Sequence, residues 1–179
     1  MITKMKPTNP IGLWCFLGVC ALAISMLLPA VGFSQTEDNV KHAMTLLKAE
    51  AAKLGAPEIK GEEPVAGKTV PVLFFGKSKI NNDFALVDAV QKETGAVATF
   101  FVASGTDFVR VSTNLKKDDG SRAIGTALDP KGKVIAAIRT GEPYYGDADI
   151  LGKAYATGYE PIRDAATNVV GIYFVGYPK

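Results

Sequence analysis

The sequence predicts an α+β domain: a central antiparallel sheet carrying a long N-terminal helix and shorter helices on one face. Two observations lead to this fold class. Over residues 37–54, apolar residues recur every three or four positions, which is typical of one face of a helix. In the second half of the chain, short β-branched and aromatic segments follow one another with turn-like links, and such strands pair antiparallel. The 179 residues suffice for one domain and a leader.

The first helix is expected to bury one apolar face against the sheet. The residues on this face are Val40, Met44, Leu47, Ala51 and Leu54. Gly55 and Pro57 then end the helix, because neither residue continues it readily. Residues 59–68 are polar and rich in Glu and Gly, so we expect a connector there.

A strand and a second helix follow the connector. Residues 69–75 are β-branched and aromatic, which favours a strand. Asn82 or Asp83 can cap the next amphipathic helix through a side-chain oxygen, and Gly95 ends that helix.

Strand signals dominate the remaining sequence. The expected strands cover residues 98–103, 108–115, 122–128, 144–151, 153–161 and 169–177. Asp119-Gly120 marks a tight hairpin before the third of these strands. Asp129 and Pro130 are expected to begin a short helix that runs to Ile138, since Asp caps helices and Pro fits their first turn.

Residues 1–34 have the order of a secretory signal peptide. Lys4 and Lys6 precede an uncharged apolar run over residues 11–28, and small residues follow up to Ser34. We expect cleavage after Ser34, with cleavage after Gly32 as the alternative. The alternative is an uncleaved N-terminal membrane anchor, because the run approaches the roughly twenty residues that cross a bilayer. The protein is therefore expected to be periplasmic or secreted, or held by one membrane span, with a single domain at residues 35–179.

Charge and cysteine content exclude several function classes for the exported chain. Removal of Lys4 and Lys6 from the 20 basic residues leaves 18, against 18 acidic residues, so the mature net charge is zero. Nucleic acids and anionic membranes require clustered basic charge, so neither is expected as a partner. Cys15 and Cys20 both lie in the leader, which excludes disulfides and thiolate chemistry after cleavage.

Two stretches of the sequence carry a family resemblance. Residues 99–130 read TFFVASGTDFVRVSTNLKKDDGSRAIGTALDP, and residues 141–176 read GEPYYGDADILGKAYATGYEPIRDAATNVVGIYFVG. They resemble the single Cache sensor domain of the Cache 3/Cache 2 fusion type, found in the extracytoplasmic part of bacterial methyl-accepting chemotaxis proteins and sensor kinases. The resemblance spans most of residues 69–176. It implies a PAS-like fold that binds a small molecule outside the membrane.

Strand alternation selects the candidate ligand-binding residues. Lys153, Tyr155 and Tyr159 fall on one face of their strand, and a cation with two phenols suits an anionic ligand. Arg110 offers a planar fork of donors that matches a carboxylate, so an organic acid or an amino acid is the expected ligand class. The alternative for Arg110 is a surface ion pair with Asp107 or Glu160.

Tyr145 and its neighbour Tyr144 are considered as a pocket wall with a hydroxyl donor, and Tyr145 is the further candidate. The alternative is that both belong to the aromatic core with their hydroxyls satisfied near the rim.

No catalytic, metal or cofactor site is expected. His42 is the single histidine and lies on the first predicted helix, so a serine–histidine pair has no second candidate base. Asp147 and Asp149 do not continue into a calcium-loop pattern. Gly76-Lys77-Ser78 lacks the glycine spacing of a phosphate loop.

These observations predict a sensing protein rather than an enzyme. We expect it to bind a small molecule outside the cytoplasmic membrane and, lacking its own transmitter, to act in chemotaxis or signal transduction through a membrane receptor or kinase. The alternative is an accessory or structural interaction protein that forms a homodimer through the helix at residues 37–54.

Overall fold

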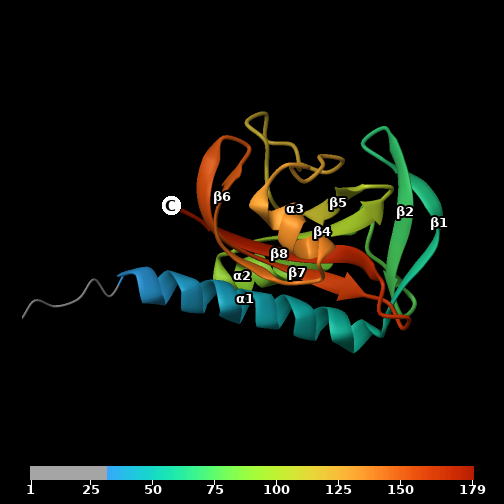
Figure 1. The fold of residues 1–179 in the computed structure, drawn as a ribbon, viewed down its shortest axis with the longest axis horizontal. Helices are drawn as coiled ribbons and strands as arrows, with labels where there is room; N and C mark the ends of the chain where they lie inside the picture. Colours follow the sequence, from blue (N-terminus) through green and yellow to red (C-terminus); the bar gives the residue numbers. More distant parts are fainter. Residues whose placement is uncertain (1–31) are drawn as a thin grey trace, which may run out of the picture.

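Three helices and two antiparallel sheets make up residues 32–179, the part of the chain that the computed structural model describes, with side chains from Thr36 onward (Figure 1). The predicted signal peptide or anchor, with its cleavage site, lies almost entirely outside the described residues. Within the described part, none of the helices combines the length and apolar character that a bilayer crossing requires.

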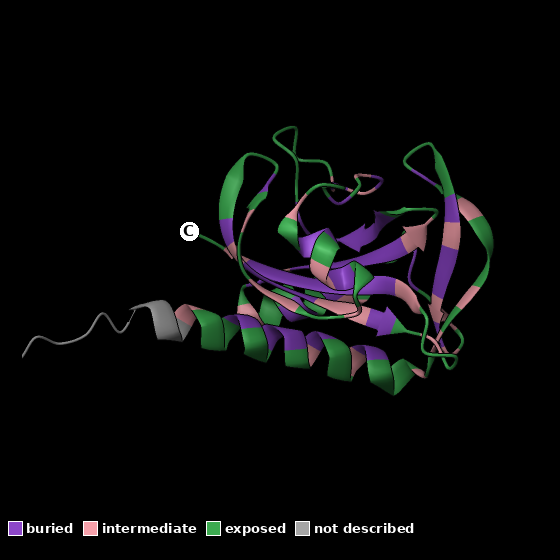
Figure 2. Ribbon diagram, in the orientation of Figure 1, coloured by how far each residue is buried: buried purple, intermediate pink, exposed green. Residues whose placement is uncertain are grey.

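The first helix, α1 (Gly32–Leu54), buries the face that the sequence predicts. Val40, Met44, Leu47 and Ala51 are almost fully buried, whereas Leu54, at the end of the helix, is 37% exposed. The buried face of α1 packs on the last two strands of the main sheet, and its outer face is exposed (Figure 2).

The main sheet has five strands in the order β5-β4-β8-β7-β6, all antiparallel. The strands are β4 (Val97–Ser104), β5 (Asp107–Thr113), β6 (Tyr144–Ile150), β7 (Lys153–Arg163) and β8 (Val169–Pro178). Five of the six strands expected in this part of the sequence therefore exist.

The two faces of the main sheet carry separate cores. On one face, Tyr173 and Val175 of β8 pack with α1 and α2 (Ala85–Thr94). On the other face, Ile172 and Phe174 pack with α3 (Lys133–Arg139). The helices thus cover both faces, so the expectation that all of them lie on one face was wrong, while the α+β fold class is confirmed.

A smaller sheet joins β1 (Pro57–Val65), β2 (Lys68–Phe75) and β3 (Ser78–Lys79). The prediction of a connector over residues 59–68 was wrong, because most of this stretch is β1 and its hairpin with β2. Most of β1 is exposed, and Val65 is its one buried residue. β1 therefore needs few apolar residues. Its sequence lacks the apolar alternation that would have predicted a strand.

Two further local predictions need correction. Asp129 and Pro130 do not begin α3: the Asp129 side chain accepts from the Lys131 N–H at 3.0 Å, which forms a turn, and the helix starts at Lys133. Residues 122–128 are not a continuous strand, since only two isolated bridges pair them. Gly125 interrupts the segment with a φ of +74° where its Cα faces Ala66, and a Cβ there would lie 2.6 Å from the Ala66 Cβ.

The predicted cap of α2 is only partly right. Gly95 ends the helix in the left-handed conformation and donates to the Gln91 carbonyl. Asp83 accepts from the Ala85 N–H at 2.9 Å, while Asn82 instead donates to Glu63 and to the Pro64 carbonyl.

Candidate ligand-binding site

A cavity of about 450 Å³ opens between the α3 side of the main sheet, α3 itself and β6. Its size falls within the range of small-molecule pockets. The wall includes Arg110 from β5, Thr126 from the segment beside β5, Lys133 from α3, Tyr144 from β6 and Tyr159 from β7. Five separate parts of the chain therefore contribute to one hollow.

Arg110 is the most unusual residue of this cavity. Its side chain is 5% exposed, and its Nη1 donates to the hydroxyl of Thr126. Its guanidinium lies over the Phe101 ring, 4.9 Å from the ring centroid. Within the described residues, no carboxylate pairs with Arg110, and its buried Nε has no hydrogen-bond partner.

Burial without an acidic partner shapes the electrostatics of Arg110. Desolvation lowers the pKa of the guanidinium to about 10, against a smaller raising effect of Tyr159. Arg110 therefore remains charged at neutral pH, with an unsatisfied donor, beside a hollow large enough for a ligand. The alternative of a surface pair with Asp107 or Glu160 does not hold, because Arg110 is buried and Glu160 is bonded to Lys48 and Tyr145.

Two phenols stand in the same cavity. Tyr159 is 1% exposed, and its ring packs against Phe174 with centroids 4.7 Å apart. Burial raises the pKa of Tyr159, which keeps its hydroxyl protonated and able to donate. The Tyr144 ring meets the Tyr159 ring edge-on at 6.2 Å, and its hydroxyl donates to the Asp147 carbonyl at 2.9 Å.

Charged side chains also line the cavity. Asp129, Asp147 and Asp149 contribute carboxylates, and Lys133 contributes a cation. Asp147 forms an ion pair with Lys179 at 2.6 Å. The Asp149 carboxylate accepts from the Gly152 N–H at 2.8 Å, so it also stabilises the β6–β7 turn.

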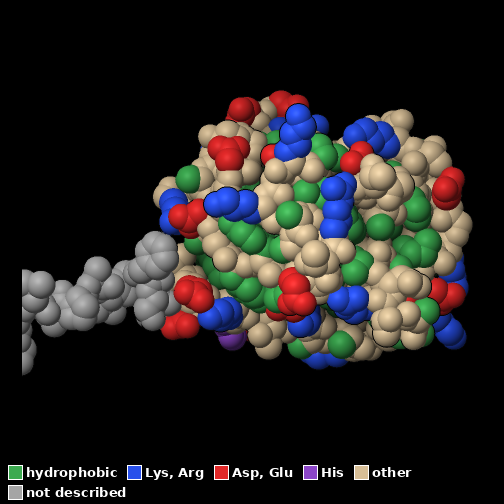
Figure 3. Space-filling view, in the orientation of Figure 1, with side chains coloured by type: hydrophobic (Ala, Val, Ile, Leu, Met, Phe, Trp, Pro, Cys, Tyr) green, Lys and Arg blue, Asp and Glu red, His purple; other side chains and the backbone are tan. Residues whose placement is uncertain are grey.

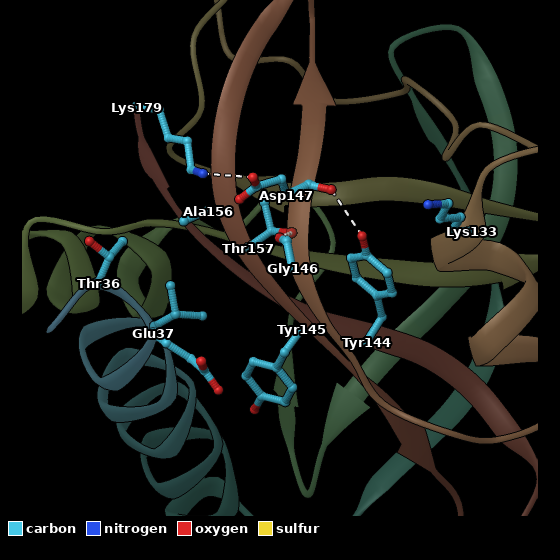
Figure 4. A pocket seen from close by; sticks show the side chains of 11 residues that line it. Thr36, Glu37, Lys133, Tyr144, Tyr145, Gly146, Asp147, Ala156, Thr157 and Lys179 are labelled. Atoms are coloured by element: carbon cyan, nitrogen blue, oxygen red, sulfur yellow. Dashed lines mark hydrogen bonds and ion pairs between the residues drawn. The ribbon is translucent and has the colours of Figure 1, made fainter. Parts of the chain in front are cut away.

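A second hollow, of about 410 Å³, adjoins the first on the α1 side (Figure 4). Its wall comprises Thr36, Glu37 and Val40 of α1, Lys133, Lys179, and Tyr144, Tyr145, Gly146, Asp147, Ala156 and Thr157 of the β6–β7 hairpin. In the space-filling view, hydrophobic side chains are visible in a depression between the start of α1 and β6 (Figure 3). Lys133, Tyr144 and Asp147 line both hollows.

The sequence-predicted site residues are divided among three hollows. Arg110 and Tyr159 share the first cavity, and Tyr145 lines the second hollow with its hydroxyl donating to Glu160 at 2.5 Å. Lys153 and Tyr155 line a third, smaller hollow of about 180 Å³. The Lys153 side chain is 65% exposed and faces Asp118 at 3.2 Å.

Two residues of the first cavity escaped the sequence analysis as candidates: Thr126 and Lys133. Thr126 lies beside Arg110 because the Arg110 N–H donates to the Thr126 carbonyl at 2.9 Å, and the Gly125 N–H donates back to the Arg110 carbonyl at 2.8 Å. The turn signal Asp119-Gly120, after which the chain can fold back along β5, is the one feature of the sequence that predicts the pairing of Arg110 with Thr126.

Asp119, at the predicted hairpin, takes a structural role. Asp119 accepts from both the N–H and the hydroxyl of Ser121, and these bonds lower the pKa of its carboxyl. Within residues 36–179, no three His, Cys, Asp or Glu side chains converge as a metal site would require. His42 lies exposed on α1.

The comparisons with known proteins agree with this geometry. The family model described as Cache 3/Cache 2 fusion domain matches residues 33–179, which is nearly the whole described part of the chain. A comparison with curated proteins found no match. Cache domains are extracytoplasmic sensory domains that bind small molecules, and the helices and antiparallel sheets described above are consistent with their PAS-like architecture. The chain therefore belongs to the Cache 3/Cache 2 fusion domain family.

Proposed function

We propose that this protein senses a small organic carboxylate, which it binds in the cavity beside Arg110. Residues 1–34 would export it to the periplasm or cell exterior as a signal peptide, or hold it at the membrane as an anchor. Binding would then be passed to a membrane receptor or kinase, as in chemotaxis or another signal transduction pathway. Homodimerisation through α1 would be compatible with this role.

The observation that carries the proposal is the buried charge of Arg110. Burying a cation without an anionic partner is costly, and buried charges in proteins are normally paired. Here the guanidinium has one hydroxyl acceptor and one aromatic ring as neighbours, and its Nε donor is unsatisfied. A ligand carboxylate offers two acceptor oxygens and a negative charge. It would therefore supply both a hydrogen-bond acceptor and a counter-ion to the guanidinium.

Amino acids belong to the proposed ligand class. Asp129 and Asp149 line the cavity, where an ammonium group could face their carboxylates while the ligand carboxylate faces Arg110. A carboxylic acid without an ammonium group would leave Asp129 and Asp149 exposed to solvent. Binding of an amino acid should therefore depend on these two aspartates, whereas binding of a simple acid should not.

A thermal-shift screen of the purified protein against carboxylates, their matching amides, amino acids, amines and purines tests the proposal. A carboxylate at a hundredfold its Kd should stabilise the protein by about 2.7 kcal/mol, and its amide should not. Arg110→Met should abolish the shift, while Lys92→Met, which removes an exposed cation of α2, should leave it unchanged. Stabilisation by amines or purines alone would overturn the carboxylate assignment.

A further inference from the structure

The cavity beside Arg110 holds a second polar group without a partner, the hydroxyl of Tyr159. The Tyr159 side chain is 1% exposed and lines this cavity. Its ring packs against those of Tyr144 and Phe174, with centroids 6.2 and 4.7 Å away. The Tyr144 hydroxyl donates to the Asp147 carbonyl, but none of the described residues forms a hydrogen bond with the Tyr159 hydroxyl. A buried hydroxyl normally has a partner, so this one is available to a ligand in the cavity.

Arg110 can hold both oxygens of a carboxylate without help from Tyr159. Its Nη1 donates to Thr126, whereas its Nε and Nη2 have no hydrogen-bond partner in the part of the chain that the structure describes. These two nitrogens share one edge of the planar guanidinium, and that edge matches the two oxygens of a carboxylate. The Tyr159 hydroxyl therefore remains available for a different atom of the ligand.

Electrostatic effects place the two groups near each other. Burial raises the pKa of the Tyr159 phenol, and the charge of Arg110 lowers it by a smaller amount. Burial in turn lowers the pKa of Arg110, and Tyr159 raises it less. The Tyr159 hydroxyl therefore stays protonated at neutral pH and can donate to an acceptor on a ligand that Arg110 holds.

The cavity favours an uncharged oxygen over a second anion as this acceptor. Lys133, the other cation of the wall, has no ion pair with any described residue, but it is exposed and water can solvate it at little cost. The same wall carries the carboxylates of Asp129, Asp147 and Asp149, which disfavour a second negative charge. The group that lacks a partner and is also buried is the neutral phenol of Tyr159.

We infer that the ligand is an oxygenated monocarboxylate: its carboxylate binds the Nε–Nη2 edge of Arg110, and a carbonyl or hydroxyl oxygen further along it accepts from Tyr159. This inference rests on the proposed function and extends it. An acid without the second oxygen would still pair with Arg110 but would leave the Tyr159 donor unsatisfied in a buried site, which is costly. Tyr159 therefore selects among the acids that Arg110 binds.

Isothermal titration calorimetry with matched acids tests this inference. Pentanoate is compared with 2-oxopentanoate, 4-oxopentanoate and the corresponding hydroxy acids, which place the second oxygen at different distances from the carboxylate. The best of these oxygenated acids should bind about fivefold tighter than pentanoate, since one neutral hydrogen bond is worth about 1 kcal/mol. Glutarate, which carries a second carboxylate in place of the uncharged oxygen, should gain no such preference.

Tyr159→Phe removes the hydroxyl and keeps the ring packing. This variant should bind pentanoate within about twofold of the wild type and lose the preference for the oxygenated acid. Tyr155→Phe is the matched control and should keep the preference, because Tyr155 lies on the same face of β7 but lines a different hollow. Without ligand, the urea denaturation midpoint of Tyr159→Phe should not fall, since the hydroxyl has no partner in the protein. Arg110→Met should lose binding of all these acids.

The outcomes separate the two proposals. If the oxygenated acids bind no tighter than pentanoate and all require Arg110, the second contact is wrong and the carboxylate sensor stands. A preference that persists in Tyr159→Phe, or a fall in the denaturation midpoint of this variant, would overturn the role of Tyr159. Tighter binding of glutarate that is lost in Lys133→Met would assign a second anion and also contradict the inference. If no acid binds at all, the proposed function itself fails.

Discussion

The guanidinium carbon of Arg110 lies 4.9 Å from the centroid of the Phe101 ring, and the two residues are directly paired across β5 and β4. A register shift between Phe100 and Phe101 produces this pairing. Bulges of this kind often occur beside functional sites, where they re-aim a side chain. The aromatic face offsets part of the cost of burying the cation, but it supplies no hydrogen-bond acceptor in the plane of the guanidinium.

The first prediction concerns the stability of the ligand-free protein. Arg110→Met should raise the free energy of unfolding by about 1 kcal/mol, because an apolar side chain of similar length replaces an unpaired buried charge. Urea denaturation without added ligand measures this change. Thr126 keeps a partner in the variant, since its hydroxyl also donates to the Ala123 carbonyl at 2.8 Å.

Ile172→Ala is the matched control for this measurement. Ile172 lies on the same face of the sheet and is fully buried, so the truncation should cost about 3 kcal/mol as in an ordinary core. A comparable loss of stability in Arg110→Met would mean that Arg110 stabilises the fold. It would contradict the assignment of Arg110 as an unpaired buried charge that awaits a ligand.

The second prediction concerns the pH dependence of carboxylate binding. The ligand-free pKa of Arg110 is about 10, so affinity should be constant from about pH 6 to 9 and fall above pH 10 as the guanidinium loses its charge. The bound carboxylate favours the charged form, so binding raises this pKa and takes up protons above pH 10. Below about pH 4 the ligand itself becomes protonated and binding weakens.

Calorimetry in buffers of different ionisation enthalpy measures this proton uptake directly. The Lys133→Met variant removes the other cation of the cavity wall and should retain the alkaline decline. An affinity that stays flat to pH 11.5 in folded protein would assign the anchor to a group other than Arg110.

The sequence was sufficient for most of the fold because most elements carry local signals. The apolar face of α1, the Gly95 stop and five strands of the main sheet each show in their own residues. β1 does not, since a mostly exposed strand needs no apolar alternation. Its existence depends on pairing with β2, which is a property of two segments together.

The site was harder to predict because its residues meet through long-range pairing. Alternation placed Lys153, Tyr155 and Tyr159 on one face of β7. It could not show that Lys153 lies at the exposed β6–β7 turn and lines a different hollow from Arg110. Nor could it show that α3 and Arg110 lie around the same cavity. Arg110 stands out from the other candidates only once its burial without an acidic partner is visible.

The third prediction separates Arg122 from ligand binding. Its two Nη atoms each donate to Asp88 at 2.8 Å, Nη1 also donates to the Thr113 carbonyl, and the guanidinium lies 4.3 Å from the Phe84 ring centroid. Arg122→Met should therefore lower the free energy of unfolding by about 1 kcal/mol, a modest value because the pair is partly exposed.

Denaturation and ligand titration of Arg122→Met give distinct readouts. Stability should fall, and carboxylate affinity should stay within twofold of the wild type, since Arg122 does not line the cavity. Loss of affinity with unchanged stability would move Arg122 into the binding site.

The fourth prediction concerns Asn114, which is 4% exposed and closes the end of β5. Its Oδ1 accepts from the Ala98 N–H at 2.8 Å, and its Nδ2 donates to the Val87 carbonyl at 2.6 Å, linking β4 to α2. Asn114→Leu keeps the shape but leaves the buried Ala98 N–H without its acceptor, which should cost about 2–3 kcal/mol in urea denaturation.

The same substitution at an exposed site controls for the change of residue type. Asn168→Leu, in the β7–β8 loop, should alter stability by no more than about 0.5 kcal/mol. Equal effects at the two positions would show that the buried amide has no special role.

The last prediction tests a tight glycine contact between β8 and β4. Gly171 of β8 lies against β4, and a Cβ there would stand 2.3 Å from the Phe101 carbonyl oxygen. Gly171→Ala should therefore push β8 from β4 beside Arg110 and cost about 3 kcal/mol. Gly132→Ala, whose nearest neighbour would be the Asp129 side chain at 3.4 Å, should leave urea denaturation unchanged. A stable Gly171→Ala variant with wild-type carboxylate affinity would contradict this β4–β8 spacing.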